Sequence, residues 1–269
     1  MSRLEVTILG CGSSGGVPRV DGNWGACDPA DPRNARSRCS LLVRRLPERD
    51  DQAPTSVVVD TSPDFRTQMI RAGVRNVDAV LYTHDHADQT HGIDDLRAFA
   101  LISRRRVPCF MDEATSRALN ERFRYIFHGE LGYPPITEAR ALPPHGQAWE
   151  ILGESGEIPV TTFPQVHGPI ESIGYRFGGV AYSSDVSDLT AAAKEALQGL
   201  DLWIVDALRW TPHPTHADVD TALGWIEELK PRRAVLTNLH IDLDYTALAR
   251  RLPAGVEPAY DGWRAEFPR

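Results

Sequence analysis

The densest cluster of polar side chains is the segment 83–92, which reads Thr-His-Asp-His-Ala-Asp-Gln-Thr-His-Gly and follows an expected strand at 79–82. His84, His86 and Asp88 stand at alternate positions, so in an extended chain their side chains project the same way. One loop can therefore present two imidazoles and a carboxylate to a common point. This ligand set suits zinc, manganese or iron, whereas magnesium and calcium prefer mainly oxygen. The segment predicts a transition-metal site.

Three further residues with ligand chemistry follow expected strands. They are His167, Asp185 and His240. Each alone is more often a capping or surface residue. Because loops at strand ends gather at one edge of a sheet, we expect the three to converge with the segment 83–92.

The elements that must position these residues are strands and helices in a layered α/β order. Strands are expected over 4–9, 39–44, 56–59, 79–82, 149–152, 160–163, 172–177, 180–183, 202–205 and 234–236 and near Trp263; helices are expected over 64–72, from about 93, and over 115–127, 191–197, 218–229 and 245–251. No linker or internal repeat interrupts them. A single domain over 1–269 is predicted.

The glycine-rich turn 10–16 matches the G-x-G-x-x-G pattern of dinucleotide-binding folds. Such a site needs a helix that opens directly after the turn, so that its N-terminus meets the pyrophosphate. The segment 17–25 is instead turn-rich and aperiodic. We therefore interpret 10–16 as a tight loop and not as a dinucleotide site.

Composition bounds the class of protein. Hydrophobic residues make up 42% and charged residues 25%, which is ordinary globular usage. No stretch approaches the ~20 apolar residues of a membrane span, and the start reads as a strand instead of a signal peptide, so a cytoplasmic location is expected. The four cysteines are far apart, which favours free thiols. The arginine run 104–106 is interpreted as a solvated helix end.

Net charge is −8, which disfavours a long nucleic acid as partner but not a small anion. The partner expected is therefore a small phosphorylated substrate, with no membrane. A homodimer is one assembly that the sequence leaves open.

Together these motifs resemble the metallo-β-lactamase superfamily over nearly the whole chain. The branch that they resemble most is that of the phosphoribosyl 1,2-cyclic phosphate phosphodiesterases of phosphonate metabolism. The motifs that carry the resemblance are Leu9–Gly15, the histidine loop, Ser184-Asp185, His213-Pro214-Thr215-His216 and Leu236–His240. The resemblance implies a four-layer αββα sandwich with a dinuclear site at its rim.

The resemblance also implies two divalent transition metals, zinc or manganese. It assigns His84, His86 and His167 to the first ion. Asp88 and His240 would bind the second ion.

Two acidic residues complete this implied centre. Asp185 would bridge the two ions. Asp60 would lie behind the ligands and orient one of the histidines.

One residue departs from the family pattern. The family loop usually reads His-x-His-x-Asp-His, and here Gln89 replaces the last histidine, a ligand of the second ion. A neutral amide oxygen is a weaker donor to a transition metal than imidazole, so the second site should be weak, selective for manganese, or empty. His91 does not replace the missing ligand, because family members carry a histidine there too.

The loop with His213 and His216 adds a second source of chemistry. From the residues alone, a capping or solvated histidine is as reasonable as a functional one. The resemblance implies that His216 contacts the phosphate and protonates the leaving group, with Asp88 as a further catalytic residue and His213 beside the substrate. Arg19 or Arg38 could grip a phosphate, although nothing in the sequence selects between them.

The function expected is that of a metal-dependent phosphodiesterase, which hydrolyses a small cyclic or nucleotide-like phosphodiester through a metal-bound hydroxide. Two alternatives stay open. One is an RNA 3′-end processing nuclease, although the basic arm of those enzymes is not evident. The other is a non-catalytic or weakly active binding protein, as a relative from pyrroloquinoline-quinone biosynthesis suggests; Gln89 favours it. Lactam hydrolysis is disfavoured.

Overall fold

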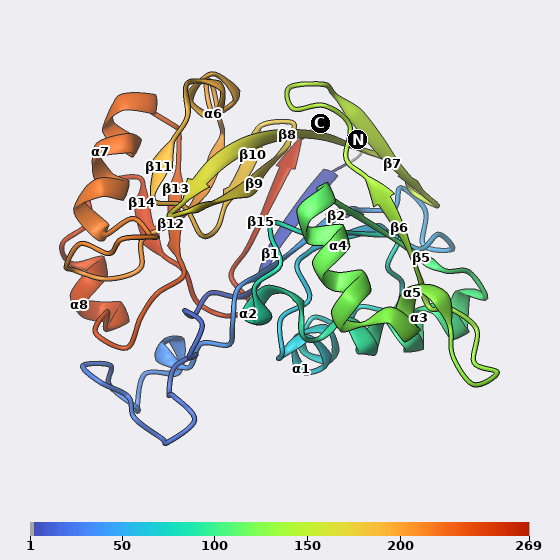
Figure 1. The fold of residues 1–269 in the computed structure, drawn as a ribbon. Helices are drawn as coiled ribbons and strands as arrows, with labels where there is room; N and C mark the ends of the chain where they lie inside the picture. Colours follow the sequence, from blue (N-terminus) through green and yellow to red (C-terminus); the bar gives the residue numbers. More distant parts are fainter. Residues whose placement is uncertain (1–2, 269) are drawn as a thin grey trace.

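The computed structural model describes residues 3–268 and contains two β-sheets packed face to face (Figure 1). The first sheet has the strand order β15-β1-β2-β3-β4-β5-β6. Its strands are β1 (Arg3–Gly10), β2 (Ser40–Arg45), β3 (Thr55–Val59), β4 (Ala79–Leu81), β5 (Val107–Met111), β6 (Thr137–Ala141) and β15 (Arg264–Pro268). The pairs from β15 to β3 are antiparallel, and those from β3 to β6 are parallel.

The second sheet has the order β11-β8-β9-β10-β12-β13-β14, and β7 pairs with β8 outside this path. Its strands are β7 (Trp149–Gly153), β8 (Gly156–His167), β9 (Ile170–Phe177), β10 (Val180–Ser183), β11 (Asp188–Leu189), β12 (Leu202–Asp206), β13 (Ala234–Thr237) and β14 (Val256–Pro258). The predicted hairpin is confirmed, because Val180 pairs with Phe177 across the Gly178-Gly179 turn. From β10 to β14 the pairs are parallel.

Helices cover the outer face of each sheet (Figure 1). Those on the first sheet are α1 (Phe65–Arg71), α2 (Ala87–Thr90), α3 (Leu96–Ser103), α4 (Glu113–Arg122) and α5 (Arg124–His128); those on the second are α6 (Ala191–Ala196), α7 (Val219–Leu229) and α8 (Tyr245–Ala249). Side-chain caps begin several of them: Asp112 accepts from the Thr115 amide and Asp218 from the Thr221 amide. Within the described residues, none of these helices has the length and apolar character to cross a membrane.

Three apolar layers hold the sheets and helices together. Alternate residues of one strand go to different layers, as the two-residue period of a strand requires. In β2, Leu41 and Val43 pack between the two sheets, whereas Leu42 packs under the helices of the first sheet with Val58 of β3. A third cluster, around Trp203, lies under α6 to α8. The predicted four-layer αββα sandwich is therefore confirmed.

Several local expectations have clear outcomes. The four cysteines are buried free thiols, and the arginine run 104–106 is exposed after the end of α3, as predicted. The single helix expected over 115–127 is instead two, α4 and α5, because Phe123 leaves the helical conformation with ψ of 39°. The chain also forms two strands, β5 and β6, in a region where the sequence indicated mainly loops.

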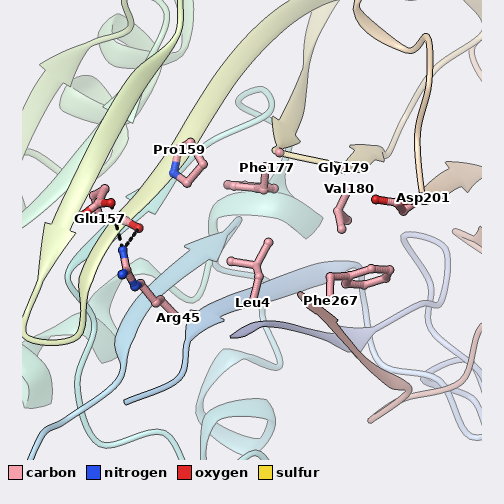
Figure 2. Close-up of a pocket in the computed structure, with 10 residues that line it drawn as sticks. Leu4, Arg45, Glu157, Pro159, Phe177, Gly179, Val180, Asp201 and Phe267 are labelled. Carbon is pink, nitrogen blue, oxygen red and sulfur yellow. Dashed lines mark hydrogen bonds and ion pairs between the residues drawn. The ribbon is translucent and has the colours of Figure 1, made fainter. Parts of the chain in front are cut away.

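The two sheets open slightly at the end where β1, β10 and β12 begin. A cavity of about 250 Å³ lies there, between Leu4, Phe177 and Val180 (Figure 2). An ion pair at 3.1 Å between Arg45 and Glu157 closes one side of it. Because the candidate ligands follow the other ends of these strands, this cavity is remote from them.

Candidate metal centre

The candidate site lies at one edge of the sandwich, where strands of both sheets end. Strands β3 and β4 are parallel, and β8, β10, β12 and β13 run the same way within the second sheet, so their C-terminal ends meet there. The polar residues that end or follow these strands are Asp60, His84, His167, Asp185, Asp206 and Asn238.

Three of these residues have left-handed backbone conformations. The φ angles are 63° for Asp60, 54° for Asp185 and 61° for Asn238. Such angles are uncommon outside glycine, although Asp and Asn tolerate them best. The chain therefore turns sharply as it leaves each strand, and strained residues of this kind cluster at functional sites.

Three histidines form the centre of the site. One ring nitrogen of each of His84, His86 and His167 lies within 4.8 Å of the corresponding nitrogens of the others. The ring centroids are 4.4, 5.0 and 5.2 Å apart. His84 and His167 are buried, with 2% of each residue exposed. Burial lowers the pKa of His84 to about 3 and also lowers that of His167, so both imidazoles are neutral at pH 7.

Hydrogen bonds fix which nitrogen each buried histidine presents. His167 Nδ1 donates to the carbonyl oxygen of Thr215 at 2.6 Å, which leaves Nε2 with its lone pair toward the cluster. His84 Nδ1 lies 3.0 Å from the Thr83 hydroxyl, and His84 Nε2 is buried without a hydrogen-bond partner. A buried lone pair without a donor is costly unless a water molecule or a cation satisfies it, and a ring nitrogen beside two other imidazoles is well placed for a cation. The three histidines therefore fit a divalent transition-metal ion.

Asp60 lies behind this cluster but does not contact a histidine directly. Its two oxygens accept from the amide and the hydroxyl of Thr83, each at 2.8 Å. The expected orienting role of Asp60 must therefore pass through Thr83 to His84. The sequence could not show this relay, because a threonine between a strand and a ligand has no special signature.

The loop that carries the histidines is tied to α4. The guanidinium of Arg122 donates to the carbonyl oxygen of Asp85 and, at 2.6 Å, to its carboxylate. On the other side, the Thr90 hydroxyl donates to the His86 carbonyl at 2.8 Å. The ring of His91 packs on Phe123, with centroids 5.4 Å apart.

Asp185 is buried beside the histidines and accepts several hydrogen bonds. Gln89 Nε2 donates to Asp185 Oδ2 at 2.7 Å, and Ser184 Oγ donates to the same oxygen at 3.0 Å. Asn238 Nδ2 donates to Asp185 Oδ1 at 3.0 Å. Gln89 is itself fully buried, and its Oε1 has no partner.

Asp88 faces the same cleft as Asp185. Burial, and then the charge of Asp185, raise the pKa of Asp88 to about 6. Two carboxylates in one buried site repel one another, so a cation bound nearby would stabilise both.

His216 lies over the cluster, with its ring centroid 4.7 Å from that of His167. Its Nδ1 lies 2.8 Å from Asp206 Oδ2 and 3.4 Å from Asp185 Oδ1. Burial lowers the pKa of His216, but the charge and hydrogen bond of Asp206 outweigh it and raise the pKa to about 9. His216 is therefore protonated at neutral pH. Nothing in the sequence marked Asp206, which ends β12 as one more buried polar residue.

His240 is held apart from both histidine groups. Its Nδ1 lies 2.7 Å from Asp242 Oδ1, and its Nε2 accepts a short hydrogen bond from the guanidinium of Arg19. Among the described residues, a second group with ligand geometry consists of His167, Asp185 and His216 and does not include His240.

A cleft of about 350 Å³ joins these residues to the solvent. Arg19 and Arg209 lie on its walls, together with His213 and His216. The sequence left the choice between Arg19 and Arg38 open. The structure places Arg38 in an ion pair with Asp64 at 2.9 Å, and Arg209 is a cleft residue that the sequence analysis missed.

The comparisons agree with this geometry. Residues 55–241 match the β-lactamase superfamily domain, and this span includes all the proposed metal ligands. The crystal structure of a new diphosphatase from the PhnP family is 37% identical, with a TM-score of 0.85, and covers 99% of this chain and 98% of that one. Zinc-bound PqqB of Methylobacterium extorquens is 17% identical, with a TM-score of 0.74 over 97% of this chain and 99% of that one, which shows the fold alone.

One curated relative bears a different name. An octanoyltransferase of Porphyromonas gingivalis is 30% identical over 267 residues, which are 97% of this chain but 51% of that protein. The chain thus spans about half the length of this relative, whose name describes the whole protein. The match to the superfamily domain over 55–241 covers more than half of the chain. This protein therefore belongs to the β-lactamase superfamily and has the metallo-β-lactamase fold.

Proposed function

We propose that this protein is a metal-dependent hydrolase of a small phosphodiester, a cyclic phosphate or nucleotide-like diester in particular. The observation that carries the proposal is a three-histidine cluster beside a cleft that two carboxylates, two arginines and the protonated His216 line. The diphosphatase at 37% identity supports a phosphate-containing substrate. A cleft of about 350 Å³ is of the size that binds a small molecule.

His84, His86 and His167 would hold a divalent ion, zinc or manganese. When bound, such an ion supplies Lewis acidity toward water and toward a phosphate oxygen. Arg19 and Arg209 would neutralise the phosphate from the cleft walls, since guanidinium groups match phosphate oxygens in charge and geometry. His213 lies next to His216, with ring centroids 5.2 Å apart, and would contact the far side of the substrate.

His216 would protonate the departing oxygen. Its Nδ1 proton is directed at Asp206, so the proton on Nε2 is the one available to substrate. The Asp206 carboxylate stabilises the charged imidazole and fixes its orientation, as a general acid requires. Asp88 and Asp185 would remain ionised beside the ion.

The proposal is tested by incubating the metal-loaded protein with bis(p-nitrophenyl) phosphate, a 2′,3′-cyclic nucleotide and a dinucleoside diphosphate, with products followed by phosphorus NMR. We expect cleavage of at least one diester and its loss in His167→Ala. Cleavage of the diphosphate alone would replace diester by anhydride as the substrate class. Binding of these compounds without turnover by the metal-loaded protein would favour the non-catalytic alternative.

A further inference from the structure

The residues that a second metal ion would need already accept hydrogen bonds from the protein's own cationic or amide groups. We propose that this centre holds one tightly bound divalent ion, on His84, His86 and His167, and that Arg19 and Gln89 together take the place of a second ion. The inference rests on the proposed metal centre and concerns how that centre is built.

Gln89 covers the carboxylate side of the second position. Its Nε2 lies 2.7 Å from Asp185 Oδ2 and 3.4 Å from Asp88 Oδ2, so one amide group faces both carboxylates. An amide nitrogen is a donor with no lone pair for a metal. Because Gln89 is fully buried, its amide cannot turn away into solvent.

Arg19 covers the histidine side of the same position. Asp242 fixes the proton of His240 on Nδ1, so Nε2 is the nitrogen that could bind a metal. The guanidinium of Arg19 donates to this Nε2. A guanidinium does not lose its proton in proteins, so Arg19, which is an exposed residue, holds a permanent positive charge beside the nitrogen that a second ion would require.

At the three-histidine position, by contrast, no amide or guanidinium group of the described residues donates to the ligand nitrogens. His84 Nε2 has no donor, and the lone pair of His167 Nε2 is directed into the cluster by the Thr215 carbonyl. There His167 Nε2 lies 3.4 Å from the ring nitrogen Nδ1 of another ligand, His86. The neighbouring group with His216 is not equivalent, because His216 Nδ1 donates to Asp206 and offers no lone pair there. The three-histidine position therefore has no positively charged side chain in it, whereas the guanidinium of Arg19 already lies at the second position.

The replacement has a consequence for substrate binding. A second metal would neutralise phosphate oxygens by direct coordination. Arg19 lies on the cleft wall and can supply the positive charge through two parallel N–H donors. We therefore assign Arg19 to the substrate phosphate as well as to His240.

The test is the metal content of the chain 1–269, loaded with excess manganese, desalted and measured by elemental analysis and by electron paramagnetic resonance. We expect about one ion per chain with the spectrum of isolated Mn(II). In the double variant Arg19→Ala/Gln89→His we expect about two ions and the spectrum of a spin-coupled pair. Arg38→Ala, which removes an arginine paired with Asp64, is the matched control and should retain about one ion.

Two ions with spin coupling in the unmodified protein would overturn the inference and leave the proposed function intact. No retained manganese or zinc would overturn both. Circular dichroism and thermal unfolding check that the double variant is folded. If it is not, the metal count of the unmodified protein alone still decides between one ion and two.

Discussion

The replacement of Asp206 by asparagine should lower the pKa of His216. Asp206 is fully buried and accepts from His216 Nδ1 at 2.8 Å. Burial lowers the pKa of His216, yet the charge and hydrogen bond of Asp206, with smaller contributions from the charges of Asp185 and Asp88, bring it from 6.5 to about 9. That difference corresponds to roughly 3 kcal/mol in favour of the charged imidazole. Without the Asp206 charge the pKa of His216 should fall from about 9, although the charges of Asp185 and Asp88 would still favour the protonated imidazole.

The pKa values of Asp206 and His216 set the pH range over which the ion pair exists. Burial raises the pKa of Asp206 to about 6, in spite of the imidazolium beside it. The ion pair therefore exists between about pH 6 and pH 9, where Asp206 is ionised and His216 is protonated. A general acid loses activity as the pH rises through its pKa. The alkaline limb of kcat/KM should accordingly move to lower pH in Asp206→Asn.

The assay is imidazole NMR of the metal-stripped protein, which reports His216 itself, together with the pH profile of kcat/KM for bis(p-nitrophenyl) phosphate. Asp242→Asn is the control, because Asp242 contacts His240 at 2.7 Å in the same way and should leave His216 unchanged. A His216 that titrates near 6.5 in the unmodified protein, or that keeps a high pKa in Asp206→Asn, would refute the reasoning.

Three further substitutions follow from the geometry. His84→Ala should abolish metal retention, measured by elemental analysis, and turnover, measured by the diester assay. His128→Ala, on the exposed side of α5, should change neither quantity. Arg209→Ala should raise KM about 10- to 100-fold for an anionic substrate, whereas Arg232→Ala, paired with Asp201 elsewhere, should leave KM unchanged. Equal KM values in the two variants would contradict the cleft assignment. Gly168→Ala should lower the free energy of unfolding by about 1–3 kcal/mol and weaken metal retention. The φ of Gly168 is 59°, and an added Cβ would lie 2.4 Å from the side chain of Thr215, whose carbonyl oxygen accepts from His167. Unchanged stability in calorimetry would contradict this.

The sequence could predict the fold and the ligand types because both depend on local patterns. The alternation of polar and apolar residues over 4–9 indicated a strand, and the spacing of His84 and His86 indicated a metal loop. The region from β5 to β6 was harder. Pro108 lies inside β5, and β6 has exposed charged residues, so neither segment has the composition of a buried strand.

Other features of the site depend on contacts between distant segments. His167 is oriented by Thr215, 48 residues away, and His240 by Arg19, 221 residues away. No periodicity or spacing encodes such pairs. The sequence identified Gln89 as a departure, but not that its amide would face Asp185. The partners of a ligand therefore required the structure, even where the ligand type did not.

The most direct test of a metal-dependent phosphodiesterase is the rate of bis(p-nitrophenyl) phosphate hydrolysis by metal-stripped protein, before and after manganese or zinc is restored. We expect no turnover in the stripped protein and recovery when metal is restored. In Asp185→Asn we expect a loss of at least about 100-fold, because a carboxylate oxygen of Asp185 lies within 4.8 Å of a ring nitrogen of His167. Equal rates with and without metal, or an unaffected Asp185→Asn, would contradict the account.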